Sequence, residues 1–158
     1  MPKALLLFAL LTLAACDSTS EVDDRWANPE SIEYAASLNI ALSKMTRTST
    51  GLYWQDMKVG EADSAAVGDN VRVHYTGWLP DGTQFDSTRD GSPVQFLLGL
   101  GFVMPGFDEG VIGMRVGGVR RLVIRPDLTG FAPGRQPPSI PPNTTLIVEV
   151  ERLTTPAQ

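Results

Sequence analysis

The chain has 158 residues, of which 42% are hydrophobic and 20% charged, so it has the composition of a globular protein with room for one domain and a short extension. Its 13 Lys and Arg against 18 Asp and Glu give a net charge of -5, which argues against nucleic acid as a partner because phosphates need a basic surface. One cysteine and one histidine exclude an internal disulfide framework and leave too few ligands for a zinc-type site, so no metal is predicted.

Residues 1–15 have the pattern of a bacterial export signal. Lys3 is followed by an apolar run that is shorter than the ~20 residues needed to span a membrane. The segment Leu13-Ala14-Ala15-Cys16 resembles a lipobox, so we predict a lipoprotein signal peptide over 1–15 and lipidation of Cys16. Ordinary cleavage that leaves Cys16 as a free thiol is the alternative. Lipidation predicts a location in the bacterial cell envelope, with the membrane as a partner and the protein facing the periplasm or the exterior.

Residues 16–28 are polar and acidic and are interpreted as a tether. Asn28-Pro29 is a good helix start, and the pattern that follows predicts an amphipathic helix over about 29–46, within a helix and linker of 29–49. Its apolar stripe either docks on the domain or binds a second copy of the chain. The stripe consists of Tyr34, Leu38, Ala41, Leu42 and Met45.

The remainder has the short alternating segments, glycines and prolines of a strand-rich domain. One short helix is expected from about 105 or 106 to 114. In the last strand, Leu146, Val148 and Val150 should share one face. These elements predict an antiparallel α+β domain over 50–153, with a tail at 154–158. The expected strands cover 52–55, 71–75, 84–86, 94–98, 119–125 and 145–153.

The sequence contains none of the usual apparatus of hydrolases or kinases. No serine lies in a nucleophile elbow, and no glycine-rich loop has the spacing of a phosphate site. His74 is predicted to be a surface histidine, because it alternates with apolar residues and has no second ligand for a metal. Aromatic and aliphatic residues gather near turns around one carboxylate, Asp86, which favours an apolar pocket with few polar groups.

The order of these segments resembles that of the FKBP-type peptidyl-prolyl isomerases, from about residue 51 to residue 153. The resemblance implies a twisted antiparallel sheet wrapped around one short helix, with a pocket between the two, and no cofactor. The segments that carry it are Val73-His74-Tyr75-Thr76-Gly77, Asp81-Gly82-x-x-Phe85-Asp86-Ser87, Phe96-Leu97-Leu98-Gly99, Pro105-Gly106-Phe107-Asp108-Glu109-Gly110, Met114-Arg115-Val116-Gly117, Ile124-Arg125-Pro126 and Ile140-Pro141-Pro142-Asn143-Thr144-Thr145-Leu146.

The same resemblance implies the residues of the site. Phe107 stands where the family usually has tryptophan, and Gly130-Phe131 stands where it usually has Tyr-Gly, so reduced activity is expected. The implied catalytic residues are Tyr75, Phe85, Asp86 and Phe107, and the implied substrate-binding residues are Val94, Val103, Met104, Phe131, Ile140 and Val148.

The implied activity is isomerisation of X-Pro bonds, assisting the folding of exported proteins. The apolar pocket would stabilise the twisted amide better than water does, with no proton transfer and no nucleophile. Proline-containing polypeptides and the macrolides that occupy FKBP pockets are the implied partners. Two other functions stay open: a non-catalytic chaperone or binding module of the cell envelope, and a structural lipoprotein.

Overall fold

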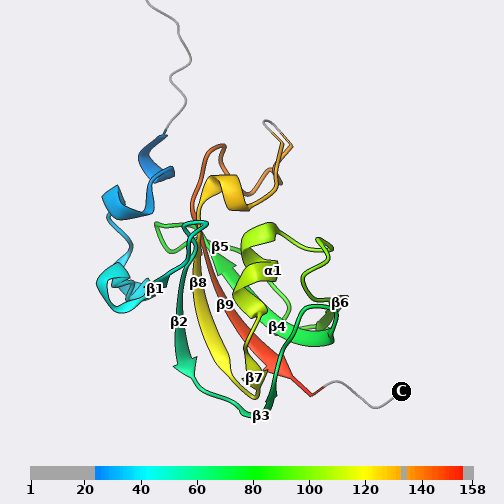
Figure 1. The fold of residues 1–158 in the computed structure, drawn as a ribbon. Helices are drawn as coiled ribbons and strands as arrows, with labels where there is room; N and C mark the ends of the chain where they lie inside the picture. The colour runs from blue at the N-terminus through cyan, green and yellow to red at the C-terminus, as the bar shows by residue number, and fades with distance from the viewer. Residues whose placement is uncertain (1–23, 133–134, 155–158) are drawn as a thin grey trace, which may run out of the picture.

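The computed structural model describes residues 24–132 and 135–154 (Figure 1). The predicted signal peptide, Cys16 and most of the tail lie outside the described residues, and the predictions made for them stay predictions. Within the described part no helix is long and apolar enough to cross a membrane. The strands are β1 (Thr46–Arg47), β2 (Tyr53–Lys58), β3 (Glu61–Ser64), β4 (Asn70–Trp78), β5 (Gln84–Ser87), β6 (Val94–Leu97), β7 (Arg115–Val116), β8 (Val119–Ile124) and β9 (Leu146–Leu153), and the α-helix is α1 (Pro105–Val111).

The strands form an antiparallel sheet in the order β1-β2-β8-β9-β4-β5. Both β5 and β6 pair with the same edge of β4: β6 with its first half and β5 with its last residues. The helix α1 lies across one face of this sheet (Figure 1). That face carries the main core, in which Leu146, Val148 and Val150 alternate with residues of the opposite face, as predicted. The fold class predicted for the domain, an antiparallel sheet with one short helix, is therefore confirmed.

Every strand expected from the sequence is present, with bounds shifted by a few residues at most. The sequence did not predict β1 or β7, which have two residues each, or β3, whose four residues are all exposed. Exposed pairs of this length have no apolar alternation to reveal them. The helix ends at Val111 rather than at Met114, because Ile112 adopts an extended ψ of 133°.

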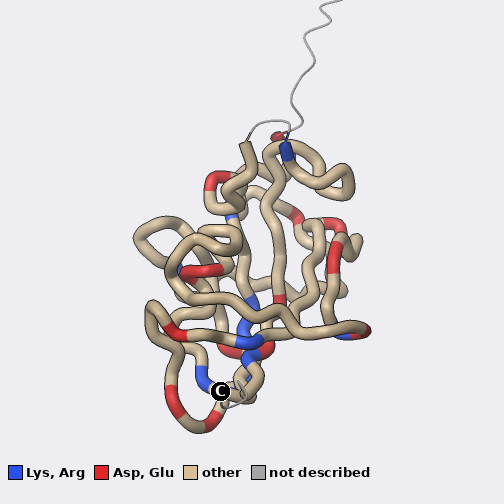
Figure 2. Tube along the Cα trace, turned by 90° about the vertical axis from the view of Figure 1, so that its right-hand side faces the viewer, with Lys and Arg blue, Asp and Glu red and all other residues tan. Residues whose placement is uncertain are grey.

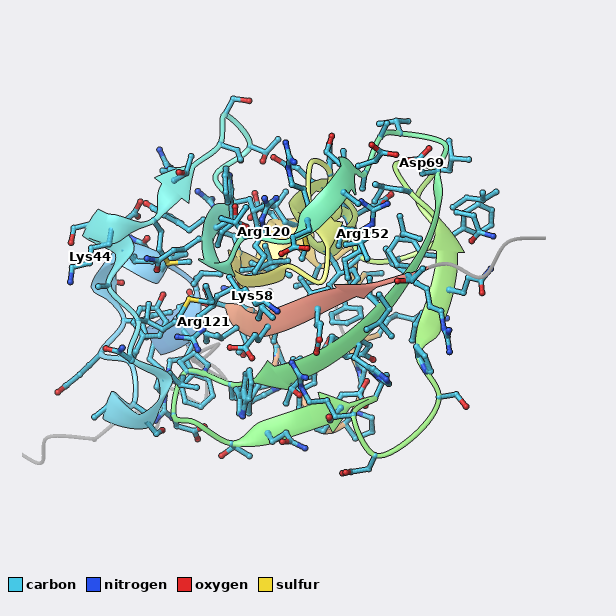
Figure 3. All side chains as sticks on the ribbon, turned by 90° about the horizontal axis from the view of Figure 1, so that it is seen from below. Lys44, Lys58, Asp69, Arg120, Arg121 and Arg152 are labelled. Atoms are coloured by element: carbon cyan, nitrogen blue, oxygen red, sulfur yellow. The ribbon has the colours of Figure 1, made fainter. Side chains whose placement is uncertain are left out.

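The helix packs closely on β8. A Cβ added to Gly110 would lie 2.6 Å from the Cδ atoms of Leu122, so glycine is required for this close approach. Beneath the end of α1, the buried Arg120 of β8 donates hydrogen bonds to the carbonyls of Gly110 and Ile112, at 3.0 Å each (Figure 3). The same guanidinium binds Asp56 of β2, so Arg120 connects the helix end to the sheet.

The predicted helix over 29–46 is wrong. The segment contains three separate 3-10 turns, at Pro29–Ser31, Ala36–Leu38 and Leu42–Lys44, joined by extended chain. Asn39 has a left-handed φ of 48°, and the N–H of Ala35 donates to the carbonyl of Pro80 in the domain, so neither residue can continue a helix. The start at Asn28-Pro29 is real, since the Asn28 side chain caps the first turn, but it opens only one turn.

The apolar residues of this segment dock on the domain, which was one of the two alternatives. Leu38 is buried with Tyr53, Val123 and Ile147, and these residues point to the sheet face opposite α1 because they alternate with core residues. Nearer the start of the segment, the carbonyl of Trp26 accepts a hydrogen bond from the N–H of Thr145. Residues 34–45 therefore pack on the outer face of the sheet, Thr46–Arg47 join its edge as β1, and the segment belongs to the folded unit.

Truncating Leu38 tests this packing. Leu38→Ala is expected to lower the free energy of unfolding by about 2–4 kcal/mol, because a leucine that is 6% exposed leaves a cavity against the sheet. Urea unfolding of the purified chain measures the change. The control is Leu100→Ala, since Leu100 is 56% exposed and its truncation should cost less than about 0.5 kcal/mol. Equal stability of the two variants would contradict the docking.

Candidate active site

A hollow of about 320 Å³ opens where β4, β5, the start of α1 and the loop before β9 meet. Its walls are mostly apolar, and the one carboxylate among them is Asp86. The residues that line it are Tyr75, Phe85, Asp86, Met104, Phe131, Pro137, Ser139 and Ile140. Six of these eight residues were predicted as site residues from the sequence.

Tyr75 and Asp86 form the polar part of the hollow. The Tyr75 hydroxyl donates to Asp86 Oδ2 at 2.5 Å, and Asp86 Oδ1 accepts the N–H of Ser87. Burial of the phenol, followed by this hydrogen bond and the charge of Asp86, raises the pKa of Tyr75 to about 12. The phenol is therefore a neutral donor at physiological pH, and it fixes the direction of the carboxylate at the mouth of the hollow.

Phe85 reaches the hollow across β4. Its ring lies over Gly77, where an added Cβ would be 2.4 Å from Phe85 Cζ. Gly77 and Asp86 are register partners of β4 and β5, so the pairing of the two strands places Phe85 beside the Tyr75–Asp86 pair. Any larger residue at 77 would push the ring out of its place.

Phe107 does not line the hollow. It is 4% exposed on α1, and its ring packs edge-on against the Tyr75 ring at 5.6 Å between centroids, with Phe96 at 5.9 Å on another side. The prediction that Phe107 forms the floor of the pocket stays a prediction: the ring packs against Tyr75 from the core, because α1 carries it inward. An aromatic platform is present, but Tyr75 is the part of it that faces the hollow.

Residues 55–153 match the family described as FKBP-type peptidyl-prolyl cis-trans isomerase, which is more than half of the chain. The chain belongs to this family. The expectation taken from the sequence motifs is thereby confirmed, and the FKBP domain is a peptidyl-prolyl cis-trans isomerase.

Relatives of known name and structure agree. An FK506-binding protein of Neisseria meningitidis serogroup B is 45% identical over 104 residues, which are 65% of this chain and 94% of the relative. FK506-binding protein 1 of Dictyostelium discoideum is 46% identical over 99 residues, 62% of this chain and 92% of the relative. The structure of AtFKBP13 superposes with a TM-score of 0.63 at 32% identity, over 71% of this chain and 98% of that chain.

The structure of FkpA from Escherichia coli superposes with a TM-score of 0.62 at 38% identity, over 70% of this chain. This chain covers 51% of the length of FkpA, so the comparison concerns the FKBP domain alone. The domain boundary predicted at residue 50 stays a prediction, although residues 34–45 pack against the same sheet.

Three residues predicted to bind substrate lie away from the hollow. Val94 and Val103 line a separate hollow beside β6, and Val148 is 1% exposed in the core of the FKBP domain. Val94, Val103 and Val148 are therefore not among the residues that line the hollow at Tyr75.

The described residues between β8 and β9 supply the rest of the wall. Phe131 and Ile140 line the hollow as predicted, while Pro137 and Ser139 were missed. The signal for these two was the proline-rich run directly before Ile140, but loop residues without periodicity show no side that faces a site. Phe131 brings a phenyl ring and no hydroxyl, so this part of the hollow is apolar.

His74 is half-buried on β4, and its Nδ1 lies 3.1 Å from the hydroxyl of Thr88. Among the residues that the structure describes, no group of three or more His, Cys, Asp or Glu is placed to hold a metal. The histidine therefore has a hydrogen-bonding role on the strand, next to the loop that follows β5.

The hydrogen bond to Asp86 should be visible in the titration of Tyr75. In Asp86→Asn the pKa of Tyr75 is expected to fall below about 12 but to stay above its ordinary value of 10, since burial remains while the carboxylate charge is lost. NMR titration of chain labelled at tyrosine Cζ measures it, with Tyr75→Phe assigning the signal.

The titration also has a consequence for stability. Because the folded state raises this pKa, the stabilisation is full below pH 10 and disappears as the pH rises towards 12. The Tyr75→Phe variant should lack this loss above pH 10. An unchanged Tyr75 pKa in Asp86→Asn would contradict the hydrogen bond.

Proposed function

We propose that this isomerase is anchored by a lipid in the bacterial cell envelope and assists the folding of exported proteins through the hollow at Tyr75. The observation that carries the mechanism is an apolar hollow with one oriented polar pair, Tyr75–Asp86, at its wall. The proposed location follows from the lipobox-like segment that ends at Cys16 and from the acidic residues after it.

The chemistry requires only differential stabilisation. Rotation about an X-Pro bond is slow because the amide must lose its resonance, with a barrier of roughly 18–20 kcal/mol for peptide bonds. The planar amide is more dipolar than the twisted amide of the transition state. Transfer from water into an apolar pocket therefore raises the energy of the planar form more than that of the transition state. An isomerase of this type therefore needs neither a nucleophile nor a metal.

Each wall of the hollow has a part in this scheme. Phe85, Ile140 and Phe131 surround the prolyl ring and exclude water from it. Asp86, held by Tyr75, provides the polar contact beside the twisting bond. The backbone N–H of Met104 donates a hydrogen bond to a substrate carbonyl, as the family resemblance implies.

The mechanism is tested with an X-Pro peptide in a protease-coupled isomerisation assay. Phe85→Ala and Asp86→Ala are each expected to lower kcat/KM on the order of ten-fold, since each removes an interaction worth about 1–2 kcal/mol. FK506 should inhibit the wild type competitively, given the names of the relatives. Val59→Ala is the control, because Val59 is 69% exposed and lies in the turn between β2 and β3. Wild-type rates in both pocket variants would refute the assignment.

The anchor has its own test. Cys16→Ser is expected to abolish incorporation of labelled fatty acid and to release the protein from the membrane fraction of a producing bacterium. Isomerase activity of the purified chain should stay the same, because Cys16 precedes every residue of the hollow by more than fifty positions. Unchanged labelling would refute the lipidation.

A further inference from the structure

A second apolar surface lies beside β6, outside the Tyr75 hollow. Leu97 is 40% exposed, Leu100 56% and Phe102 67%. Val67 adjoins them, since a Cβ added at Gly99 would be 2.8 Å from Val67 Cγ1. We call Val67, Leu97, Leu100 and Phe102 the β6 patch. Large apolar side chains that are exposed together mark interaction sites.

The patch borders a hollow of about 540 Å³, lined by the four residues of β6 together with Phe102, Val103 and Asn70. After β6 the chain turns and returns to α1, and the hollow lies between the strand and this returning segment. Residues 91–107 carry no charge (Figure 2, tan trace). Residues 91–107 therefore add no charged side chain to this surface.

The returning segment is held in place from inside the protein. The carboxylate of Asp108, 5% exposed on α1, accepts the N–H of Gly99 at 2.6 Å and that of Gly101 at 2.9 Å. These bonds fix the loop that presents Leu100 and Phe102. The exposure of both side chains is thus a property of a defined loop.

The occupant that this surface fits is an extended polypeptide. Among the described strands, β6 pairs with β4 only, so its other edge has no strand partner (Figure 1). An unpaired edge is a template for strand addition, in which main-chain hydrogen bonds give affinity and alternate side chains enter adjacent pockets. The β6 hollow is such a pocket.

The β6 hollow and the hollow at Tyr75 are related through the core and through neighbouring residues of the chain. The Phe96 ring of β6 contacts Phe107, which contacts Tyr75. Val103 lines the β6 hollow, and the next residue, Met104, lines the Tyr75 hollow. A chain bound with proline at Tyr75 needs only a few extended residues to reach β6.

We propose that the free edge of β6 and the β6 patch bind an extended apolar segment of the unfolded substrate, close in sequence to the proline that is isomerised. The proposal rests on the proposed function, because it assumes that the prolyl ring sits at Tyr75. It assigns a preference for apolar residues near proline to Leu97 and Phe102.

The experiment compares peptides that share one X-Pro core. One peptide consists of the core alone. The others carry four additional residues, either apolar or polar, on the N-terminal or the C-terminal side of the core. An apolar extension at one end is expected to raise kcat/KM about ten-fold, which corresponds to burial of about one large apolar side chain. In Leu97→Ser/Phe102→Ser the gain should vanish while the rate on the core peptide stays the same. N-methylation of alternate extension amides should also remove the gain, because it blocks strand addition.

Val59→Ser is the matched control, an exposed apolar residue far from β6, and it should keep the gain. The proposal is overturned if the gain survives in the double variant or if all extended peptides react at equal rates. It is also overturned if the β6 patch binds a second copy of the chain or lipid vesicles in place of peptide. Activity on the core peptide reports on the proposed function separately. If that activity is absent, fluorescence anisotropy of the labelled peptides still decides whether the apolar extension binds at β6.

Discussion

Replacing Phe107 by alanine is expected to lower the free energy of unfolding by about 3–5 kcal/mol and to abolish measurable isomerase activity. Phe107 is 4% exposed and lies between the rings of Tyr75 and Phe96, so its loss leaves a cavity in the core beneath the site. Tyr75 would then move towards the cavity, and Asp86 Oδ2 would lose the hydrogen bond from the phenol. Denaturant unfolding and the peptide assay measure the two effects.

The conservative variants separate stability from catalysis. Phe107→Leu keeps most of the volume and should cost less than about 2 kcal/mol of stability, but it removes the edge-on ring contact and should lower kcat/KM by about ten-fold. Phe107→Trp puts a larger ring at this buried position between Tyr75 and Phe96, and the overpacking is expected to cost about 1–3 kcal/mol of stability. If Phe107→Leu has wild-type kcat/KM, the support of Tyr75 by this ring has no part in catalysis.

Replacing Arg120 by methionine is expected to lower the free energy of unfolding by about 3–5 kcal/mol. The guanidinium lies 4.1 Å from the ring centroid of Trp54, and it binds both carboxylate oxygens of Asp56, at 2.6 and 3.2 Å. Its bonds to the carbonyls of Gly110 and Ile112 would also be lost, and a buried carbonyl without a partner is costly. Arg115→Met, at an exposed position of β7, is the control and should change stability by less than about 0.5 kcal/mol.

Two further measurements define the role of Arg120. The double variant Arg120→Met/Asp56→Leu should lose less stability than Arg120→Met alone, because no unpaired carboxylate is left at the helix end. At a temperature where Arg120→Met is still folded, its kcat/KM should stay within about three-fold of the wild type, since the contacts of Arg120 are at the far end of α1 from Met104. A large kcat/KM loss with unchanged stability would contradict this structural role.

The strands of the domain could be predicted because each buries alternate residues. Val71 and Val73 in β4, and Leu146, Val148 and Val150 in β9, repeat every second position, which reflects the pleat of a sheet with a core on one side. Tyr75, Phe85 and Asp86 could be placed in the site because their motifs match those of a family, and residues 55–153 prove to belong to it. Local pattern and family motif agree in this part of the chain.

The segment before the domain shows where a local pattern misleads. The helical spacing of Tyr34, Leu38, Leu42 and Met45 is real, yet these side chains reach one apolar cluster from 3-10 turns and extended chain. These side chains pack on the sheet face formed by Tyr53, Val123 and Ile147. The hydrogen bond from the Ala35 N–H to the Pro80 carbonyl holds the backbone in a non-helical course. Helical propensity over this length is too weak to oppose such tertiary contacts.

The amino-acid sequence alone determined the strand pattern, the family and the identity of the polar pair at the site, because these depend on residue type and spacing. Only the tertiary structure decided that Phe107 supports Tyr75 from behind, that Val94 and Val103 face a second hollow, and that Pro137 and Ser139 close the first one. Each of these depends on the direction of a side chain at the end of an element or in a loop. Such directions follow from how α1, β6 and the loop before β9 pack together, which no repeat in the sequence encodes.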